Sequence, residues 1–416
     1  MPKAILVRGA RQLLTLRGPT GPRRGTDLRN LAIIPDGAVL IVDGRIHDVG
    51  PSRRLENLAL ARQAALIDAS GRVVMPGFVD SHTHLASGPA RFRDSSGTPN
   101  LARTINQLSP RTLQAQALHS VDEALRHGTT TIESRSGFGV TEANEIKILR
   151  VHAALQKQSV PLISTFSASA SQDTEASQHM DWLCSHLLPL IHRRKLAQFA
   201  AIHCCDEHGR DENGRNENGF TVDQARRYLL AARQLKFGLQ ISTGAGSPTE
   251  SIALAVELGI ASIGHLLNAT PTDAVHLAQS PTVATLLPGP IFHLGTADYP
   301  PARMFIDSGV AVALGSRYHP ETSPSQSMQM MIALACTHMN MTPSEAVTAA
   351  TINAAHALGM GSSIGSLESG KSADLLILDV PDYREIPYHF GMNLVDTVIK
   401  SGNVLVERSE VKWPSL

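Results

Sequence analysis

The sequence of 416 residues predicts an α/β fold: a (β/α)8 TIM-like barrel with a small composite β-sandwich built from both chain ends. In the middle of the chain, apolar runs alternate with helical stretches, the pattern of βαβ units around a parallel sheet. Short β-like runs separated by turn residues occur at both ends. We therefore expect residues 1–65 and 366–416 to form the sandwich and residues 66–365 to form the barrel.

Eight apolar runs in the middle of the chain have the length and bounding residues of buried strands, and eight is the number that a TIM-like barrel requires. They span residues 73–79, 129–133, 162–166, 199–204, 238–242, 261–266, 283–287 and 310–315. Sites in such barrels lie at the C-terminal ends of the strands. The residues that follow each run are therefore the candidates for a functional site.

The chain ends carry shorter runs, at residues 4–7, 31–34, 38–42, 46–49, 373–379 and 395–406. Turn signals at Pro35-Asp36-Gly37 and Asp43-Gly44 separate the N-terminal runs, and the second favours a β-hairpin. Residues 208–219 are polar, rich in glycine and without periodicity, which predicts a surface loop.

Composition limits the partners and the compartment. Lys+Arg and Asp+Glu both number 37, so no net charge favours nucleic acid or an anionic membrane. No apolar run reaches membrane-spanning length, and the first residues lack the apolar region of a secretory signal. The four cysteines have no disulfide-framework spacing. We expect a cytoplasmic protein that binds neither nucleic acid nor membrane.

The strand expected first in the barrel leads into His82-Thr83-His84. Strand residues two apart face the same side, so these two imidazoles can hold one metal ion. A lone His-x-His is weak evidence, but here Pro-Gly-Phe-Val-Asp precedes a serine and the pair. The whole string resembles the first barrel strand of the metal-dependent amidohydrolase superfamily.

Within that superfamily the chain resembles the imidazolonepropionase family over nearly its whole length. The stretches that carry the resemblance are residues 128–139, 145–150, 220–229, 286–288, 349–359, 365–375 and 387–393. The resemblance implies hydrolytic opening of a cyclic amide C–N bond, that of imidazolone propionate in histidine degradation, with zinc or iron as cofactor.

The resemblance also implies a ligand set, which this chain only partly retains. His82 and His84 match two metal ligands, whereas Ser242 stands at a ligand histidine, Ala245 at a glutamate that handles the water proton, and Arg317 at a ligand aspartate. A hydrolytic zinc site needs about three protein ligands; a serine hydroxyl is a poor ligand and an arginine is none. We expect that the parental activity is lost or much weakened. We expect no bound cofactor, and zinc or iron only if the site is functional, in which case the chain would still be an enzyme.

Other family positions concern the substrate and the proton transfer. Arg91 matches an arginine that contacts the substrate, and His265 matches a family histidine, here the catalytic candidate. Phe138 stands for a tyrosine, His319 for an asparagine and Ala170 for a histidine.

Two alternatives to a weakened hydrolase stay open. One is a metal-free binding protein for a small carboxylate, because Arg91 and Arg317 can supply two guanidinium groups. The other is an altered hydrolase whose metal site has moved to the strand end near Cys204, where Cys204 or His203, if it points into the barrel, could hold a metal with His82 and His84. Arg317 either replaces the metal as a cation or turns out to solvent. We expect a small-molecule ligand, and a homodimer is compatible with this class of protein.

Overall fold

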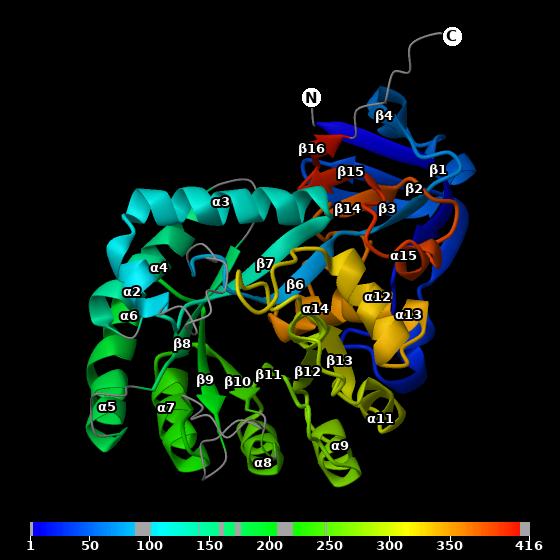
Figure 1. Cartoon of the computed structure of the whole chain (residues 1–416). Coiled ribbons are helices and arrows are strands. Elements are labelled where there is room, and N and C mark those ends of the chain that lie inside the picture. Colours follow the sequence, from blue (N-terminus) through cyan, green and yellow to red (C-terminus); the bar gives the residue numbers. More distant parts are fainter. Residues whose placement is uncertain are drawn as a thin grey trace.

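The computed structural model describes residues 3–87, 101–139, 141–157, 162–170, 176–205, 219–244, 246 and 248–407, with the side chains of 101–103 and 176 excepted. Within these ranges the strands form two eight-stranded sheets. One is a ring of parallel strands with helices outside it, and the other is a mixed sheet beside it that contains both the first and the last strand (Figure 1). The expected combination of a TIM-like barrel and a composite β-structure from both chain ends is confirmed.

The barrel contains all eight strands that the alternation predicted. In ring order they are β6 (Phe78–Thr83), β7 (Thr129–Arg135), β8 (Leu162–Ala168), β9 (Phe199–Cys204), β10 (Gly238–Thr243), β11 (Ser262–Gly264), β12 (Val283–Leu286) and β13 (Ala311–Leu314). The seam between β13 and β6 is joined at its C-terminal end, where the backbone N–H of His84 donates to the carbonyl of Tyr318 at 2.8 Å. The ring is therefore drawn together at the end where the site is expected.

The second sheet interleaves the two chain ends. Its strands are β1 (Ala4–Leu14), β2 (Ile33–Val42), β3 (Arg45–Pro51), β4 (Ala65–Asp68), β5 (Val73–Pro76), β14 (Leu375–Leu378), β15 (Val395–Lys400) and β16 (Asn403–Glu407). The order is β16-β15-β14-β5-β1-β2-β3, with β4 also paired to β1. The sheet curls, so that the start of β3 hydrogen-bonds to the segment before β14 (Ile46 N–H to the Lys371 carbonyl, 2.9 Å). Its strands enclose one cluster of buried apolar side chains.

The run expected as one barrel strand at residues 73–79 is divided. Its first half, β5, pairs with β14 and β1 in the mixed sheet, and only its second half, β6, enters the barrel. The break falls at Gly77, where a Cβ atom would lie 2.2 Å from Oγ1 of Thr130. The two sheets thus approach so closely at this point that only glycine fits between their strands.

The prediction of a turn at Pro35-Asp36-Gly37 is wrong, because strand β2 continues through these residues. Pro35 pairs with Gln12 of β1, and Asp36 takes a positive φ of 47°. These residues bend the strand without ending it. The hairpin expected at Asp43-Gly44 is confirmed, with both residues at positive φ between the antiparallel strands β2 and β3.

The helices cover the barrel and connect its strands. They are α1 (Ser52–Leu55), α2 (Leu101–Gln107), α3 (Pro110–Arg126), α4 (Glu142–Leu155), α5 (Ala176–Trp182), α6 (Leu188–Arg193), α7 (Val222–Gln234), α8 (Thr249–Leu258), α9 (Pro271–Ala278), α10 (Pro288–Leu294), α11 (Ala302–Asp307), α12 (Met328–His338), α13 (Pro343–Ala349), α14 (Ile352–Ala357) and α15 (Glu385–Tyr388), with short 3-10 turns η1 (Gly25–Arg29) and η2 (Ala61–Gln63) and a π-helical turn η3 (Leu183–Leu187).

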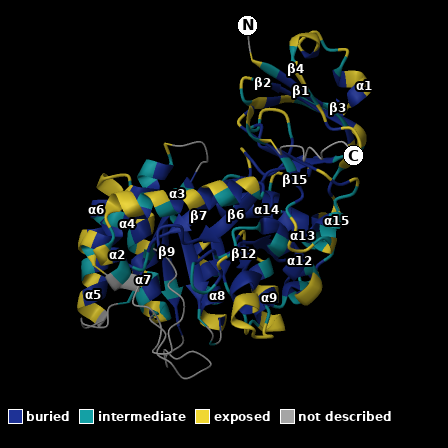
Figure 2. Cartoon of the chain, turned by 45° about the horizontal axis from the view of Figure 1, so that its top comes forward, coloured by how far each residue is buried: buried dark blue, intermediate teal, exposed yellow. Residues whose placement is uncertain are grey.

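Local sequence explains where several of these helices begin. Thr221, Thr270 and Thr342 cap α7, α9 and α13, each within a reciprocal capping box. The outward faces of the barrel helices are exposed and the strands are buried (Figure 2). Within the described part of the chain, no helix combines the length and the apolar character needed to cross a bilayer.

Candidate functional site

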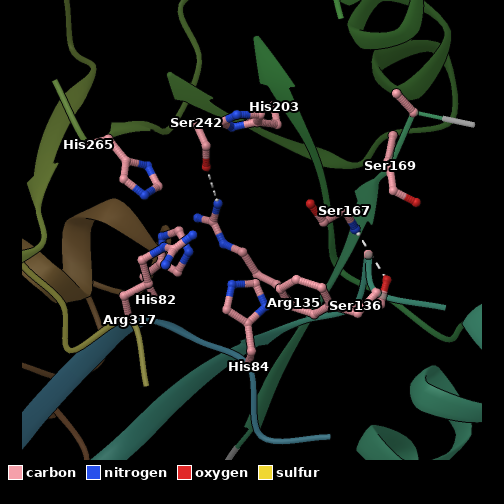
Figure 3. A pocket seen from close by; sticks show the side chains of 14 residues that line it. His82, His84, Arg135, Ser136, Ser167, Ser169, His203, Ser242, His265 and Arg317 are labelled. Atoms are coloured by element: carbon pink, nitrogen blue, oxygen red, sulfur yellow. Dashed lines mark hydrogen bonds between the residues drawn. The ribbon is translucent and has the colours of Figure 1, made fainter. Parts of the chain in front are cut away.

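A cavity of about 320 Å³ opens at the C-terminal ends of the barrel strands. Strand register brings its residues to one level: Ser242 of β10 pairs with His203 of β9 and with Gly264 of β11, directly before His265. Figure 3 shows the side chains that line it, among them those of His82, His84, Arg135, Ser242, His265 and Arg317. The cavity lies where the sequence led us to expect a site.

His82, in β6, and His84, directly after it, both face this cavity, as continued strand alternation requires. Their ring centroids lie 5.4 Å apart. Burial lowers the pKa of both imidazoles well below the usual value, and nearby guanidinium groups, of Arg135 for His82 and of Arg317 for His84, lower it further. The two rings are therefore neutral at physiological pH.

Asp80, two residues earlier, anchors this strand to the end of β13. Its carboxylate accepts hydrogen bonds from the backbone N–H of Ser316 at 2.9 Å, from the Ser316 hydroxyl, and from the backbone N–H of His82 at 3.3 Å. Burial raises the pKa of Asp80 to about 6, against these hydrogen bonds. Asp80 thus links β6 to Ser316, shortly after the end of β13, across the seam of the barrel.

Arg135, the last residue of β7, is a charged site residue that we did not predict from the sequence. Its side chain is almost fully buried, and its Nε–H donates to both oxygens of Glu133, at 2.9 and 3.2 Å. Its Nη1 donates to the hydroxyl of Ser242 at 2.9 Å. In Figure 3 the guanidinium lies between Ser242, His265 and the two histidines of β6.

Glu133 and Arg135 are two apart at a strand end, so both side chains point into the barrel. That spacing of opposite charges was visible in the sequence and could have identified the pair. Burial raises the pKa of Glu133 to about 7, although the positive charge of Arg135 acts in the opposite direction. Arg135 therefore brings a permanent cation to the cavity, and the carboxyl group of Glu133, which titrates near neutrality, lies directly behind it.

Arg317 faces the cavity and does not turn away from it. Its Nη1 donates to the hydroxyl of Thr322 at 3.2 Å. Its backbone has a positive φ of 47°, and His265 and Leu266, at the end of β11, have values of 74° and 60°. Such conformations cost on the order of 1 kcal/mol each in residues other than glycine, and they concentrate at functional sites.

Rings cover one side of the mouth. His84 packs against Phe138 with centroids 4.7 Å apart, and Phe138 packs against His319 at 4.9 Å. Burial lowers the pKa of His319 to about 3, so this ring is also neutral. Ala170, at the end of the segment that follows β8, lines the cavity with the small side chains of Ser167 and Ser169.

His203 and Cys204 lie on opposite sides of β9. His203 lines the cavity, whereas Cys204 is buried in the hydrophobic core, where burial raises the pKa of its thiol to about 12 against a hydrogen bond with Ser251. Of the two candidate ligands of the relocated site, His203 therefore faces the cavity and Cys204 does not. Arg91, Ala245 and residues 208–218 lie outside the described residues.

The side chains around the cavity do not fit a metal ion. Nδ1 atoms of His82, His84 and His265 have no hydrogen-bond partner among the described residues, as ligand atoms would. Yet in the same part of the chain no three histidine, cysteine or carboxylate side chains converge as a ligand set. The Ser242 hydroxyl accepts from Arg135, and both guanidinium groups oppose a dication at this place.

Comparison with known proteins gives the same family as the sequence motifs. The sequence profile of the amidohydrolase family matches residues 73–405. The chain is 38% identical to the imidazolonepropionase of Symbiobacterium thermophilum over 434 aligned positions, covering 99% of both chains. It is 35% identical to that of Alkaliphilus metalliredigens, covering 98% of this chain and 99% of the relative.

Solved structures resemble the fold at lower identity. A triazine hydrolase variant aligns with a TM-score of 0.74 and 18% identity, over 97% of this chain and 95% of the other. The guanine deaminase of E. coli aligns with a TM-score of 0.70 and 16% identity, over 98% and 100%. At these identities the likeness concerns the architecture alone.

Proposed function

The chain belongs to the amidohydrolase family and is imidazolonepropionase-like, and we propose that its barrel mouth is a metal-independent site for a small organic carboxylate. In this proposal the hydrolysis that relatives named imidazolonepropionase carry out is lost or much weakened. The observation that carries it is the hydrogen bond from Arg135 to Ser242, at the position where the resemblance places a ligand histidine.

The chemistry of the side chains supports this proposal. Metal-assisted hydrolysis needs a ligand set that makes a bound water acidic and a base that receives its proton. Here a guanidinium, which neither coordinates a metal nor accepts a proton, interacts with Ser242, and a second one stands at position 317. His82, His84 and His265 keep neutral rings around these cations.

The same features favour a carboxylate ligand. Guanidinium groups bind carboxylates with two parallel hydrogen bonds, and these bonds are stronger in a partly desolvated cavity than in water. The cavity of about 320 Å³ suits a ligand of the size of imidazolone propionate. The rings of His84 and Phe138, inclined at 68° to each other, add aromatic surface to one side of the cavity.

The test measures metal, turnover and binding on one preparation. We expect zinc and iron well below one ion per chain, no enzyme-like opening of imidazolone propionate, and a thermal shift with that acid or with related carboxylates. Arg317→Ala should weaken the shift, whereas Arg62→Gln, which removes an exposed guanidinium in η2, should not change it. Stoichiometric metal together with turnover would overturn the proposal, as would the absence of binding by every acid.

A further inference from the structure

Arg135 is held in place before any ligand arrives. Its Nε–H is engaged by Glu133, and its Nη1 by Ser242 of β10, three strands further around the barrel. A side chain fixed at two points loses little rotamer entropy when a third partner binds. The guanidinium is thus preorganised within the cavity.

The guanidinium still has donors to offer. It carries five N–H groups, and the hydrogen bonds to Glu133 and Ser242 use one on Nε and one on Nη1. Within the described residues Nη2 donates to none, and the side chain lines the cavity. One N–H group on Nη1 and two on Nη2 remain, and guanidinium donors of this kind form charge-assisted hydrogen bonds with carboxylate oxygens.

A second guanidinium lines the same cavity. Arg317 follows β13, on the other side of β6 from β7, and it is more exposed than Arg135. The cavity therefore has one deeply buried cation and one less buried cation, with the neutral rings of His82 and His84 on the strand between them.

We propose that Arg135 anchors an anionic group at the inner end of the ligand, so that the site selects dicarboxylates, with Arg317 facing the second carboxylate. The proposal rests on the proposed function and names its substrate class. A carboxylate offers the remaining donors of Arg135 charged acceptor oxygens, whereas the carbonyl oxygen of an amide is a neutral acceptor. This difference corresponds to about a tenfold preference in affinity.

The experiment compares matched ligands by calorimetry on the full chain. Malonate, succinate, glutarate and adipate are each titrated beside the corresponding half-amide, which removes one charge at nearly constant size. We expect one chain length to bind about tenfold tighter than its half-amide. Arg135→Gln should abolish that preference and keep the affinity for the half-amide, Arg135→Lys should keep part of the preference, and Arg62→Gln should leave all values unchanged.

The outcomes separate this inference from the proposed function. Equal binding of a dicarboxylate and its half-amide, unaffected by Arg135→Gln, overturns the dicarboxylate assignment and leaves the carboxylate site standing. No binding of any acid overturns both. If Arg135→Gln does not fold, Ser242→Ala removes only one support of the guanidinium. It should reduce the affinity for the dicarboxylate more than that for the half-amide, and an unchanged ratio overturns the inference.

Discussion

Glu133, inside the barrel next to Arg135, and Glu345, at the start of α13, are both fully buried carboxylates with arginine partners. Glu345 accepts from Arg29 at 3.0 Å, from Arg303 at 3.0 and 3.1 Å, and from the backbone N–H of Thr342 at 2.8 Å. Burial by itself raises its pKa, but these hydrogen bonds together bring it below the usual value.

Glu133 shows the opposite balance. Arg135 is its ion-pair partner among the described residues, and burial raises its pKa to about 7. The hydrogen bonds of Glu345 satisfy its carboxylate and join α13 to η1 and α11. At Glu133, by contrast, the partner Arg135 keeps donors that no described residue accepts from, and its side chain lines the cavity. The same pair of residue types thus joins secondary-structure elements in one region and, in our proposal, serves ligand recognition in the other.

The largest expected effect comes from replacing the cation in the mouth by a metal ion. Ser242→His with Arg317→Asp restores two ligand types that the resemblance implies beside His82 and His84. We expect about one zinc ion per chain by elemental analysis and a Tm that rises with added zinc. The Ser242→Ala/Arg317→Ala variant, which adds no ligand, is the control. A double variant that stays metal-free, with a Tm that zinc does not change, would contradict this expectation.

The next effect is on stability and separates the two glutamates directly. Glu345→Gln removes a charge that two arginines and a helix cap depend on, and should lower the free energy of unfolding by about 2–3 kcal/mol. Glu133→Gln should lower it by less than about 1 kcal/mol, because a carboxyl group with a pKa of about 7 is already partly protonated at neutral pH. Urea unfolding of both variants measures the difference, and the reverse order contradicts our view of the two pairs.

The smallest effect is the pH dependence of ligand binding. Above pH 7 the carboxylate of Glu133 is mostly ionised and balances the charge of Arg135. Below pH 7 Glu133 is mostly protonated, so the positive charge of Arg135 is available to an anionic ligand. Asp80, with a pKa of about 6, acts in the same direction at the lower end of this range, and the lowered pKa values keep His82, His84 and His265 neutral. Dicarboxylate affinity should therefore rise several-fold from pH 8 to pH 6 in calorimetry. Glu133→Gln should remove most of this slope, and a slope of opposite sign would contradict the assignment.

Much of the fold could be predicted from the sequence because the alternation of apolar runs and helical stretches is local information. The division of residues 73–79 could not, because it depends on how closely Gly77 approaches Thr130 from another strand. In the site, the pairing of His82 and His84 follows from strand alternation. That Arg135 reaches Ser242 depends on the curvature of the ring, which no spacing along the chain contains.

The positions of the predicted site residues can be compared with the structure, whereas their roles cannot. The structure places Phe138, Ala170, Ser242, His265 and Arg317 around one cavity, although the sequence separates them by up to 179 positions. Their roles toward a ligand stay predictions. Of Cys204 and His203, which the sequence left as alternative ligands, His203 occupies the inward-facing position of the strand and Cys204 lies in the core.

A single glycine between β5 and β6 has a consequence for engineering this chain. Because Pro76 ends a strand of the terminal sheet and Phe78 begins the barrel, no linker exists there at which the two bodies could be cut apart or exchanged with those of a relative. Gly128, at the start of β7, likewise lies so close to Leu376 of β14 that its missing Cβ would be 2.8 Å from that side chain. Chimeras with a relative should therefore exchange the terminal sheet and the barrel together.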